Sequence, residues 1–203
     1  MTPTRPEVMI APVGKQPMPI LLPILEFAPL STQLIVTGQV DEVPGYIKEA
    51  LRLREATRSL RLYAHEPVNP YDAAATFERC KTIITSQRFA GKRFAINISG
   101  GTTMMALGAQ QAAKACGVPM LYVNTDDGEI IHLAPDGTVT EREAIAAQVA
   151  VDVYIAAHGS TSRAVAPWGT GTSKQEAWIE PFMAAARMIG AAGTRSIQVL
   201  DEF

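Results

Sequence analysis

Two adjacent glycines separate an apolar run from a helix-forming stretch in the segment Ser99-Gly100-Gly101-Thr102-Thr103. Paired glycines let a turn bring its backbone N–H groups to one side, and the N-terminus of the helix that follows carries partial positive charge. Thr102 or Ser99 can cap that helix. The segment therefore has the chemistry of an anion site, and phosphate is the expected guest. A simple tight turn is the alternative interpretation of the same residues.

The elements around this turn are a predicted strand, a helix and a second strand. The run from Phe94 to Ile98 is short, apolar and β-branched enough to be a buried strand. A helix is expected from Thr102 to Cys116, because Gly117 and Pro119 stop it before a second apolar run, 120–123. Such a unit is typical of parallel α/β sheets.

Upstream of this unit, strands and helices are expected to alternate. The predicted strands are 7–13, 34–37 and 59–64, and the predicted helices are 17–27, 41–57 and 71–87. The pattern predicts an α/β fold with a Rossmann-like, doubly wound, mostly parallel sheet of strand order 3-2-1-4-5. In that order the first and fourth strands are neighbours. Gly14-Lys15-Gln16 and the glycine pair would then face one crevice.

The pattern changes after Asn124. Asp127-Gly128 and Asp136-Gly137 are hairpin signals, which predict a small antiparallel addition to the sheet. Thr140 and Glu143 form a capping-box pattern, which predicts a helix from about residue 140 to Ala157. A loop at 160–173, a helix at 174–189 and a strand at 196–200 are expected beyond it.

These elements divide the chain into a domain at residues 1–140 and a helical C-terminal extension at 141–203. The role of the extension, as a linker or as the start of an effector or winged-helix-like region, stays open.

Composition limits the classes of function. The chain has 203 residues, of which 47% are hydrophobic, and its net charge is −2. No useful cluster of lysine or arginine is present, so a long nucleic acid is not an expected partner. No signal peptide and no stretch long enough to cross a bilayer is found, so we expect a cytoplasmic protein without a membrane partner. Cys80 and Cys116 are predicted to be buried free thiols, and no metal site is predicted.

The glycine turn and its flanks resemble a known family. The segment 97–109, NISGGTTMMALGA, followed by 121–125, LYVNT, resembles the second motif of the CARF domains (CRISPR-associated Rossmann fold). It is most similar to those that precede the DNA- and RNA-cutting effectors of type III systems. Residues 16–25, QPMPILLPIL, also look like that subfamily. The resemblance covers roughly residues 7–140, and His158-Gly159 resembles the end of the helix that leaves the domain.

The resemblance implies a homodimeric sensor of cyclic oligoadenylate, with cyclic tetra-adenylate favoured, no cofactor, and a signal passed to an effector domain. Because this ring has approximate two-fold symmetry, two crevices across a dimer axis can hold it equivalently. Met104 and Met105 are otherwise expected to pack in the core or at an interface. The ligand contacts expected under the resemblance are Val13, Gly14, Lys15, Gln16, Thr37, Gly38, Asn97, Ser99, Gly100, Gly101, Thr102, Thr103 and Met104.

One position departs from the subfamily, which commonly has lysine directly after Gly-Gly-Thr, where this chain has Thr103. Absence of that cation is expected to weaken phosphate binding. Some CARF domains cut their ligand without metal by aligning a ribose 2′-hydroxyl with the adjacent phosphate. Lys15 and Ser99 are the candidates for such catalysis here.

Two alternative functions stay open. A ring nuclease would end the signal by cutting the cyclic molecule, and a nucleotide-binding Rossmann-like enzyme unrelated to CRISPR would bind mononucleotides or dinucleotides. His65 and His132 are acid–base candidates for such an enzyme, although a solvated or structural role is expected for each. Residues after 140 show no nuclease pattern, and His158 is expected on the surface.

Overall fold

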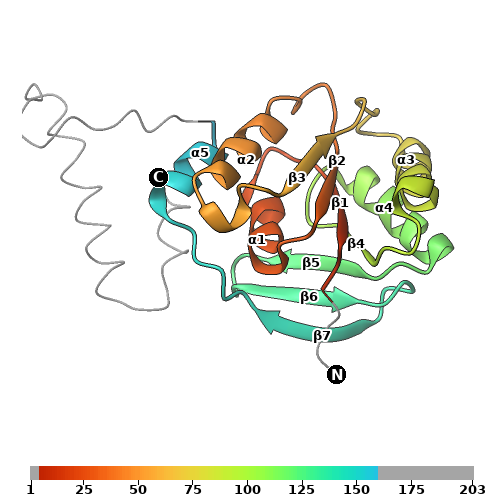
Figure 1. Ribbon diagram of the computed structural model, residues 1–203. Helices are drawn as coiled ribbons and strands as arrows, with labels where there is room; N and C mark the ends of the chain where they lie inside the picture. The colour runs from red at the N-terminus through yellow and green to blue at the C-terminus, as the bar shows by residue number, and fades with distance from the viewer. Residues whose placement is uncertain (1–4, 160–203) are drawn as a thin grey trace, which may run out of the picture. The chain divides into compact units, whose positions relative to one another are not determined.

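The computed structural model describes residues 5–159, which form a sheet with helices on both faces (Figure 1). The seven strands have the order β3-β2-β1-β4-β5-β6-β7. The strands are β1 (Val8–Pro12), β2 (Ser31–Ile35), β3 (Arg61–Ala64), β4 (Phe94–Asn97), β5 (Met120–Asn124), β6 (Glu129–Leu133) and β7 (Val139–Ala144). The α-helices are α1 (Met18–Phe27), α2 (Val43–Arg52), α3 (Ala73–Thr85), α4 (Thr103–Cys116) and α5 (Val151–Ala157).

The strand pairing confirms the predicted doubly wound architecture. Strand β1 pairs in parallel with β2 and β4, and β4 pairs in parallel with β5. Strands β6 and β7 then continue the sheet in antiparallel fashion. Strands β1 and β2 are buried along their whole length, as expected when helices cover both faces of a parallel sheet. The loops after β1, β2 and β4 therefore share the carboxyl edge of the sheet.

Two hydrophobic cores lie on opposite faces of the sheet. Helices α1, α2 and α5 cover one face, and α3 and α4 cover the other (Figure 1). Gly108 lets α4 approach α3 closely, because a Cβ at this position would lie 2.2 Å from the carbonyl oxygen of Ala73. The second core includes Cys80, whose burial raises the pKa of its thiol to about 12. Cys116 is also a free thiol, but it is only partly buried.

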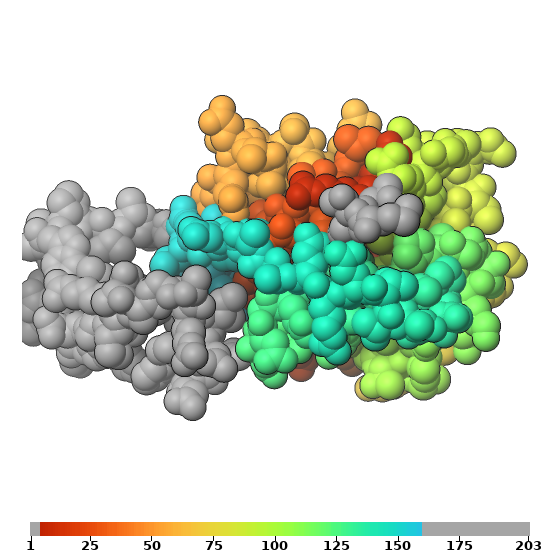
Figure 2. All heavy atoms as spheres, turned by 90° about the horizontal axis from the view of Figure 1, so that it is seen from below, coloured from red at the N-terminus to blue at the C-terminus, as the bar shows by residue number. Residues whose placement is uncertain are grey.

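The predicted helix beginning at Thr140 is wrong, because residues 139–144 form β7 instead. The Thr140 hydroxyl donates to the carbonyl oxygen of His132 at 3.2 Å, and Glu143 Oε2 lies 3.0 Å from His132 Nε2. These contacts form once the Asp136-Gly137 turn folds β7 onto β6, so hairpin register outweighs a local capping pattern. Figure 2 shows the antiparallel strands as a band across this side of the molecule.

Helix α5 is consequently short and begins at Val151. The predicted division at residue 140 falls inside β7, and the two-part organisation stays a prediction. The loop, helix and strand predicted at 160–173, 174–189 and 196–200 lie outside the described residues.

Strand β2 begins at Ser31, three residues before its predicted start, because polar side chains are buried there. Gln33 Nε2 donates to Ser31 Oγ at 2.6 Å, and Gln33 Oε1 lies 2.8 Å from His65 Nε2. Burial lowers the pKa of His65, and the charges of Arg79 and Arg88 lower it further. A neutral His65 that satisfies a buried amide has a structural role.

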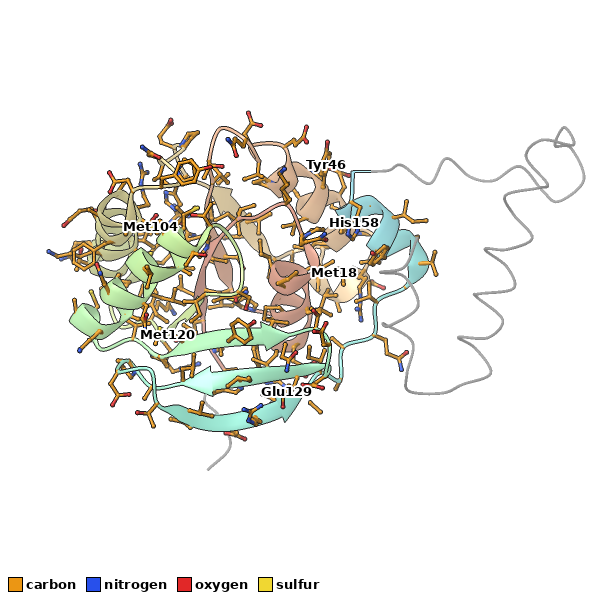
Figure 3. All side chains as sticks on the ribbon, turned by 180° about the vertical axis from the view of Figure 1, so that it is seen from behind. Met18, Tyr46, Met104, Met120, Glu129 and His158 are labelled. Carbon is orange, nitrogen blue, oxygen red and sulfur yellow. The ribbon has the colours of Figure 1, made fainter. Side chains whose placement is uncertain are left out.

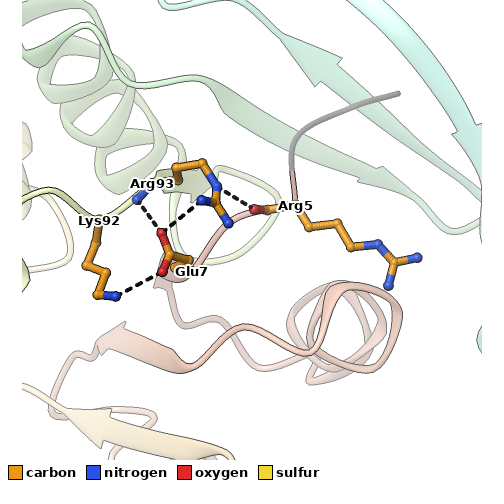
Figure 4. A network of polar contacts seen from close by, with 4 residues as sticks. All are labelled: Arg5, Glu7, Lys92 and Arg93. Carbon is orange, nitrogen blue, oxygen red and sulfur yellow. Dashed lines mark hydrogen bonds and ion pairs between the residues drawn. The ribbon is translucent and has the colours of Figure 1, made fainter. Parts of the chain in front are cut away.

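A carboxylate joins the N-terminal end of β1 to the segment that precedes β4 (Figure 4). Glu7 Oε1 accepts from Lys92 Nζ at 2.9 Å, and Glu7 Oε2 accepts from the backbone N–H of Arg93 at 3.2 Å. The hydrogen bond from Lys92, the backbone N–H of Arg93 and both positive charges hold the pKa of Glu7 below its ordinary value.

We predict that Glu7→Gln makes the unfolding free energy less dependent on pH. A carboxyl with a lowered pKa stabilises the fold above its unfolded pKa, and this contribution disappears as the pH falls through the folded pKa. The difference in unfolding free energy between wild type and Glu7→Gln should therefore be larger at neutral pH than near pH 3, measured by urea denaturation. Glu78→Gln on α3 is the control, since Glu78 forms no ion pair within residues 5–159. A pH-independent difference would contradict the assignment.

Candidate ligand site

The loops after β1 and β4 meet at the carboxyl edge of the sheet. A Cβ on Gly14 would lie 3.0 Å from the backbone nitrogen of Gly101. A Cβ on Gly100 would lie only 2.3 Å from the carbonyl oxygen of Pro12, and Gly101 has a φ of +79°. The structure thus brings together the two glycine loops that the sequence assigns to one crevice. The close packing of the turn therefore requires glycine at positions 100 and 101, in addition to their proposed role in binding.

Backbone N–H groups are available where α4 begins. Thr102 is the N-cap of α4, and its hydroxyl oxygen accepts from the N–H of Met105 at 3.2 Å. The same hydroxyl donates to the carbonyl oxygen of Pro70. Within residues 5–159, none of the backbone N–H groups from Gly100 to Met104 donates a hydrogen bond. These N–H groups and the helix dipole form a site that favours an anion.

Two of the predicted contact residues hold the turn in place. Asn97 is fully buried; its Nδ2 donates to the carbonyl oxygen of Pro19 at 2.8 Å, and its Oδ1 accepts from the N–H of Ser99 at 3.0 Å. Ser99 Oγ accepts from the N–H of Val123 at 2.6 Å, so its hydroxyl proton is still available for a ligand. Their side chains fix the loop between β4 and α4, and direct contact with a ligand stays a prediction.

The remaining predicted contacts differ in exposure. Val13 and Thr37 are buried, so only their backbones are suited to reach a ligand. Lys15, Gln16, Gly38 and Thr103 are exposed, and Met104 is 38% exposed. Lys15 forms no ion pair within residues 5–159. Its charge is therefore free to act on an anion near the glycine turn.

A hollow of about 290 Å³ adjoins the loop after β1. It is lined by Lys15, Gln39, Glu42, Tyr46 and His158 and by the apolar Val40, Val43 and Ala157. Figure 3 shows Tyr46 and His158 near each other, on α2 and at the end of α5. His158 is exposed, as predicted, but its grouping with Lys15 and Tyr46 was not predicted from the sequence. A local motif could not predict this grouping, because Lys15 and His158 are far apart in the sequence.

Residues 5–159 contain no group of three or more His, Cys, Asp or Glu side chains placed to hold a metal ion. Within the same part of the chain, no helix combines the length and apolar character needed to cross a membrane.

Comparison with known proteins shows similarity in structure. No protein-family model matches the sequence, and no curated protein matches it. The fold is similar to that of Can2 from Sulfobacillus thermosulfidooxidans in complex with cyclic tetra-adenylate, with 24% identity, a TM-score of 0.63, and coverage of 76% of this chain and 40% of Can2. It is also similar to a type III CRISPR defence DNA nuclease activated by cyclic oligoadenylate, with 17% identity, a TM-score of 0.62, and coverage of 91% and 28%.

A third similar structure is that of VC1899 from Vibrio cholerae, with 14% identity, a TM-score of 0.63, and coverage of 74% of this chain and 38% of VC1899. The chain thus spans less than half the length of each of these proteins. The similarities show the fold, a Rossmann-like α/β fold with a mostly parallel sheet, in agreement with the fold predicted from the sequence.

Proposed function

We propose that this chain is a CARF-type sensor that binds cyclic oligoadenylate in type III CRISPR defence, with cyclic tetra-adenylate as the favoured ligand. The observation that carries the proposal is the set of N–H groups at the start of α4, beside the loop of Lys15; within residues 5–159 these N–H groups donate no hydrogen bond and Lys15 forms no ion pair. Cyclic oligoadenylates present closely spaced phosphates, which such a site favours. The complex of Can2 with cyclic tetra-adenylate and the activation of the type III CRISPR nuclease by cyclic oligoadenylate support this class of ligand.

The proposed assembly is a homodimer with the ligand at its two-fold axis. Tyr71, Met104 and Leu107 are 71%, 38% and 43% exposed. The bond between Thr102 and the carbonyl oxygen of Pro70 holds the start of α3 beside the start of α4, and residues 104 and 107 lie on one side of a helix. These three side chains, which we call the α4 patch, adjoin the glycine turn and suit a second copy across the ligand.

We predict that Leu107→Asp weakens this dimer. A carboxylate in an apolar interface loses hydration without gaining a partner, so the dimer dissociation constant should rise at least about fivefold, corresponding to about 1 kcal/mol. Analytical ultracentrifugation across a concentration series measures it. Leu53→Asp is the matched control, because Leu53 is 50% exposed and follows α2 on the other face of the sheet. Equal effects of both substitutions, or none, would count against the α4 patch.

Sensing is favoured over cleavage because the cation that the subfamily carries after Gly-Gly-Thr is replaced by Thr103. Lys15 and Ser99 are the residues that would act if the ligand were cut. The effector that receives the signal is proposed to lie beyond the folded domain, in the C-terminal part of the extension or in a partner, and a cytoplasmic location fits this role.

The test is a thermal-shift titration with cyclic tetra-adenylate, cyclic hexa-adenylate and linear tetra-adenylate, followed by chromatography of the recovered ligand. At 100 times the dissociation constant, a ligand stabilises the fold by about 2.7 kcal/mol. A shift with cyclic tetra-adenylate, recovered intact, is expected. Linear product would establish a ring nuclease, and no shift with any of the three would overturn the proposal in favour of another nucleotide-binding function.

A further inference from the structure

We propose that the hollow between the loop after β1, α2 and α5 is a base subsite that takes one adenine ring of the bound oligoadenylate. This subsite rests on the proposed function. Four of its residues, Gln39, Glu42, Tyr46 and His158, are not among the ligand contacts expected from the sequence. Lys15 connects the two places, because it lines the hollow and directly follows Gly14, whose backbone packs on Gly101. A phosphate at the glycine turn therefore has a neighbouring hollow for its base.

Two rings supply walls for a planar base. Tyr46 is half-buried in α2, and His158 is held at the end of α5. The His158 ring lies on the ring of Tyr154, with a centroid distance of 4.2 Å and an interplanar angle of 34°. His158 Nδ1 lies 2.9 Å from the carbonyl oxygen of Tyr154. This bond fixes the ring in place, and aromatic rings held in this way are platforms on which bases stack.

The polar groups of the hollow match the edge of adenine. Since His158 Nδ1–H donates to a carbonyl oxygen, Nε2 of the neutral ring is an acceptor. The Gln39 amide offers a donor and an acceptor, the pair that recognises N7 and the N6 amino group of adenine. The Glu42 carboxylate can accept from the N6 amino group of adenine.

The walls are closely fitted to the domain. A Cβ on Gly159 would lie 2.6 Å from the ring of Tyr46, and Gly159 has a φ of +76°. Gly159 therefore lies directly against the ring, and α5 packs on α2 through the buried Val153 and Ala157. A base in the hollow would contact the β1 loop and α5 at once.

The test compares binding of cyclic tetra-adenylate by isothermal titration calorimetry for wild type, Gln39→Ala and His158→Ala. Each substitution is expected to weaken binding about tenfold, the effect of losing one base contact. Gln87→Ala is the control for the amide, since Gln87 lies after α3 on the other face of the sheet. Urea denaturation of each variant separates loss of contact from loss of fold.

A second measurement tests the acceptor for the amino group. Glu42→Gln keeps the size of the side chain but removes the charged acceptor, so it should weaken binding of cyclic tetra-adenylate about tenfold, whereas Glu55→Gln should leave binding unchanged. If wild type binds cyclic tetra-adenylate and all the hollow variants bind it equally well, the subsite is wrong and the proposed function stands. If wild type binds no cyclic oligoadenylate, both proposals are overturned.

Discussion

Gly100→Ala is expected to destabilise the fold by about 2–3 kcal/mol, near the upper limit for a single added methyl group. The new Cβ would lie 2.3 Å from the carbonyl oxygen of Pro12 and 3.4 Å from Ile20 Cδ1. Pro12 cannot move away easily, because it is paired with Ile35 in the centre of the sheet. The fall in unfolding free energy is measured by urea denaturation.

Gly38→Ala is the matched control for this substitution. Gly38 belongs to the neighbouring loop after β2, and a Cβ there would meet nothing within 4 Å. Its unfolding free energy should stay within about 0.5 kcal/mol of wild type. A stability of Gly100→Ala equal to that of Gly38→Ala would show that the turn yields to the methyl group. Close packing would then not require a glycine at position 100, and only the proposed role in binding would account for it.

The parts of the fold that sequence predicts well are those in which local pattern and tertiary packing agree. The apolar run before Gly100 has no alternative to a central buried strand, and Gly117 ends α4 in a left-handed conformation with a φ of +67°. The strand order followed from the alternation of such elements. It also correctly placed the Gly14 loop beside the glycine pair, which is the basis of the candidate site.

Prediction failed where long-range contacts decide the outcome. Ser31, Thr32 and Gln33 do not resemble a buried strand, yet they form one because Ser31 and His65 satisfy the Gln33 side chain. Thr140 begins no helix, because its hydroxyl bonds a residue on the preceding strand. The hollow between Lys15 and His158 depends on the packing of α5 against α2, so the spacing of residues in the sequence does not predict it.

Thr103→Lys is expected to raise the affinity for cyclic tetra-adenylate by roughly ten- to a hundredfold. Thr103 is exposed at the first position of α4, beside N–H groups that donate to no other residue of the described chain. A lysine there adds a charge-assisted hydrogen bond to phosphate, worth about 1.5–3 kcal/mol. Binding should also become more salt-dependent, because one more cation neutralises the ligand. Calorimetry at two salt concentrations measures both effects.

The same substitution should slightly destabilise the free protein, by about 0.5 kcal/mol, since a cation opposes the dipole at a helix N-terminus. A gain in affinity together with a loss of stability would be specific to this position. Thr85→Lys is the control with the same change in net charge, because Thr85 is exposed at the C-terminal end of α3. If Thr85→Lys strengthened binding as much as Thr103→Lys, the gain would come from net charge alone. The result would then contradict the proposal that the glycine turn binds a phosphate.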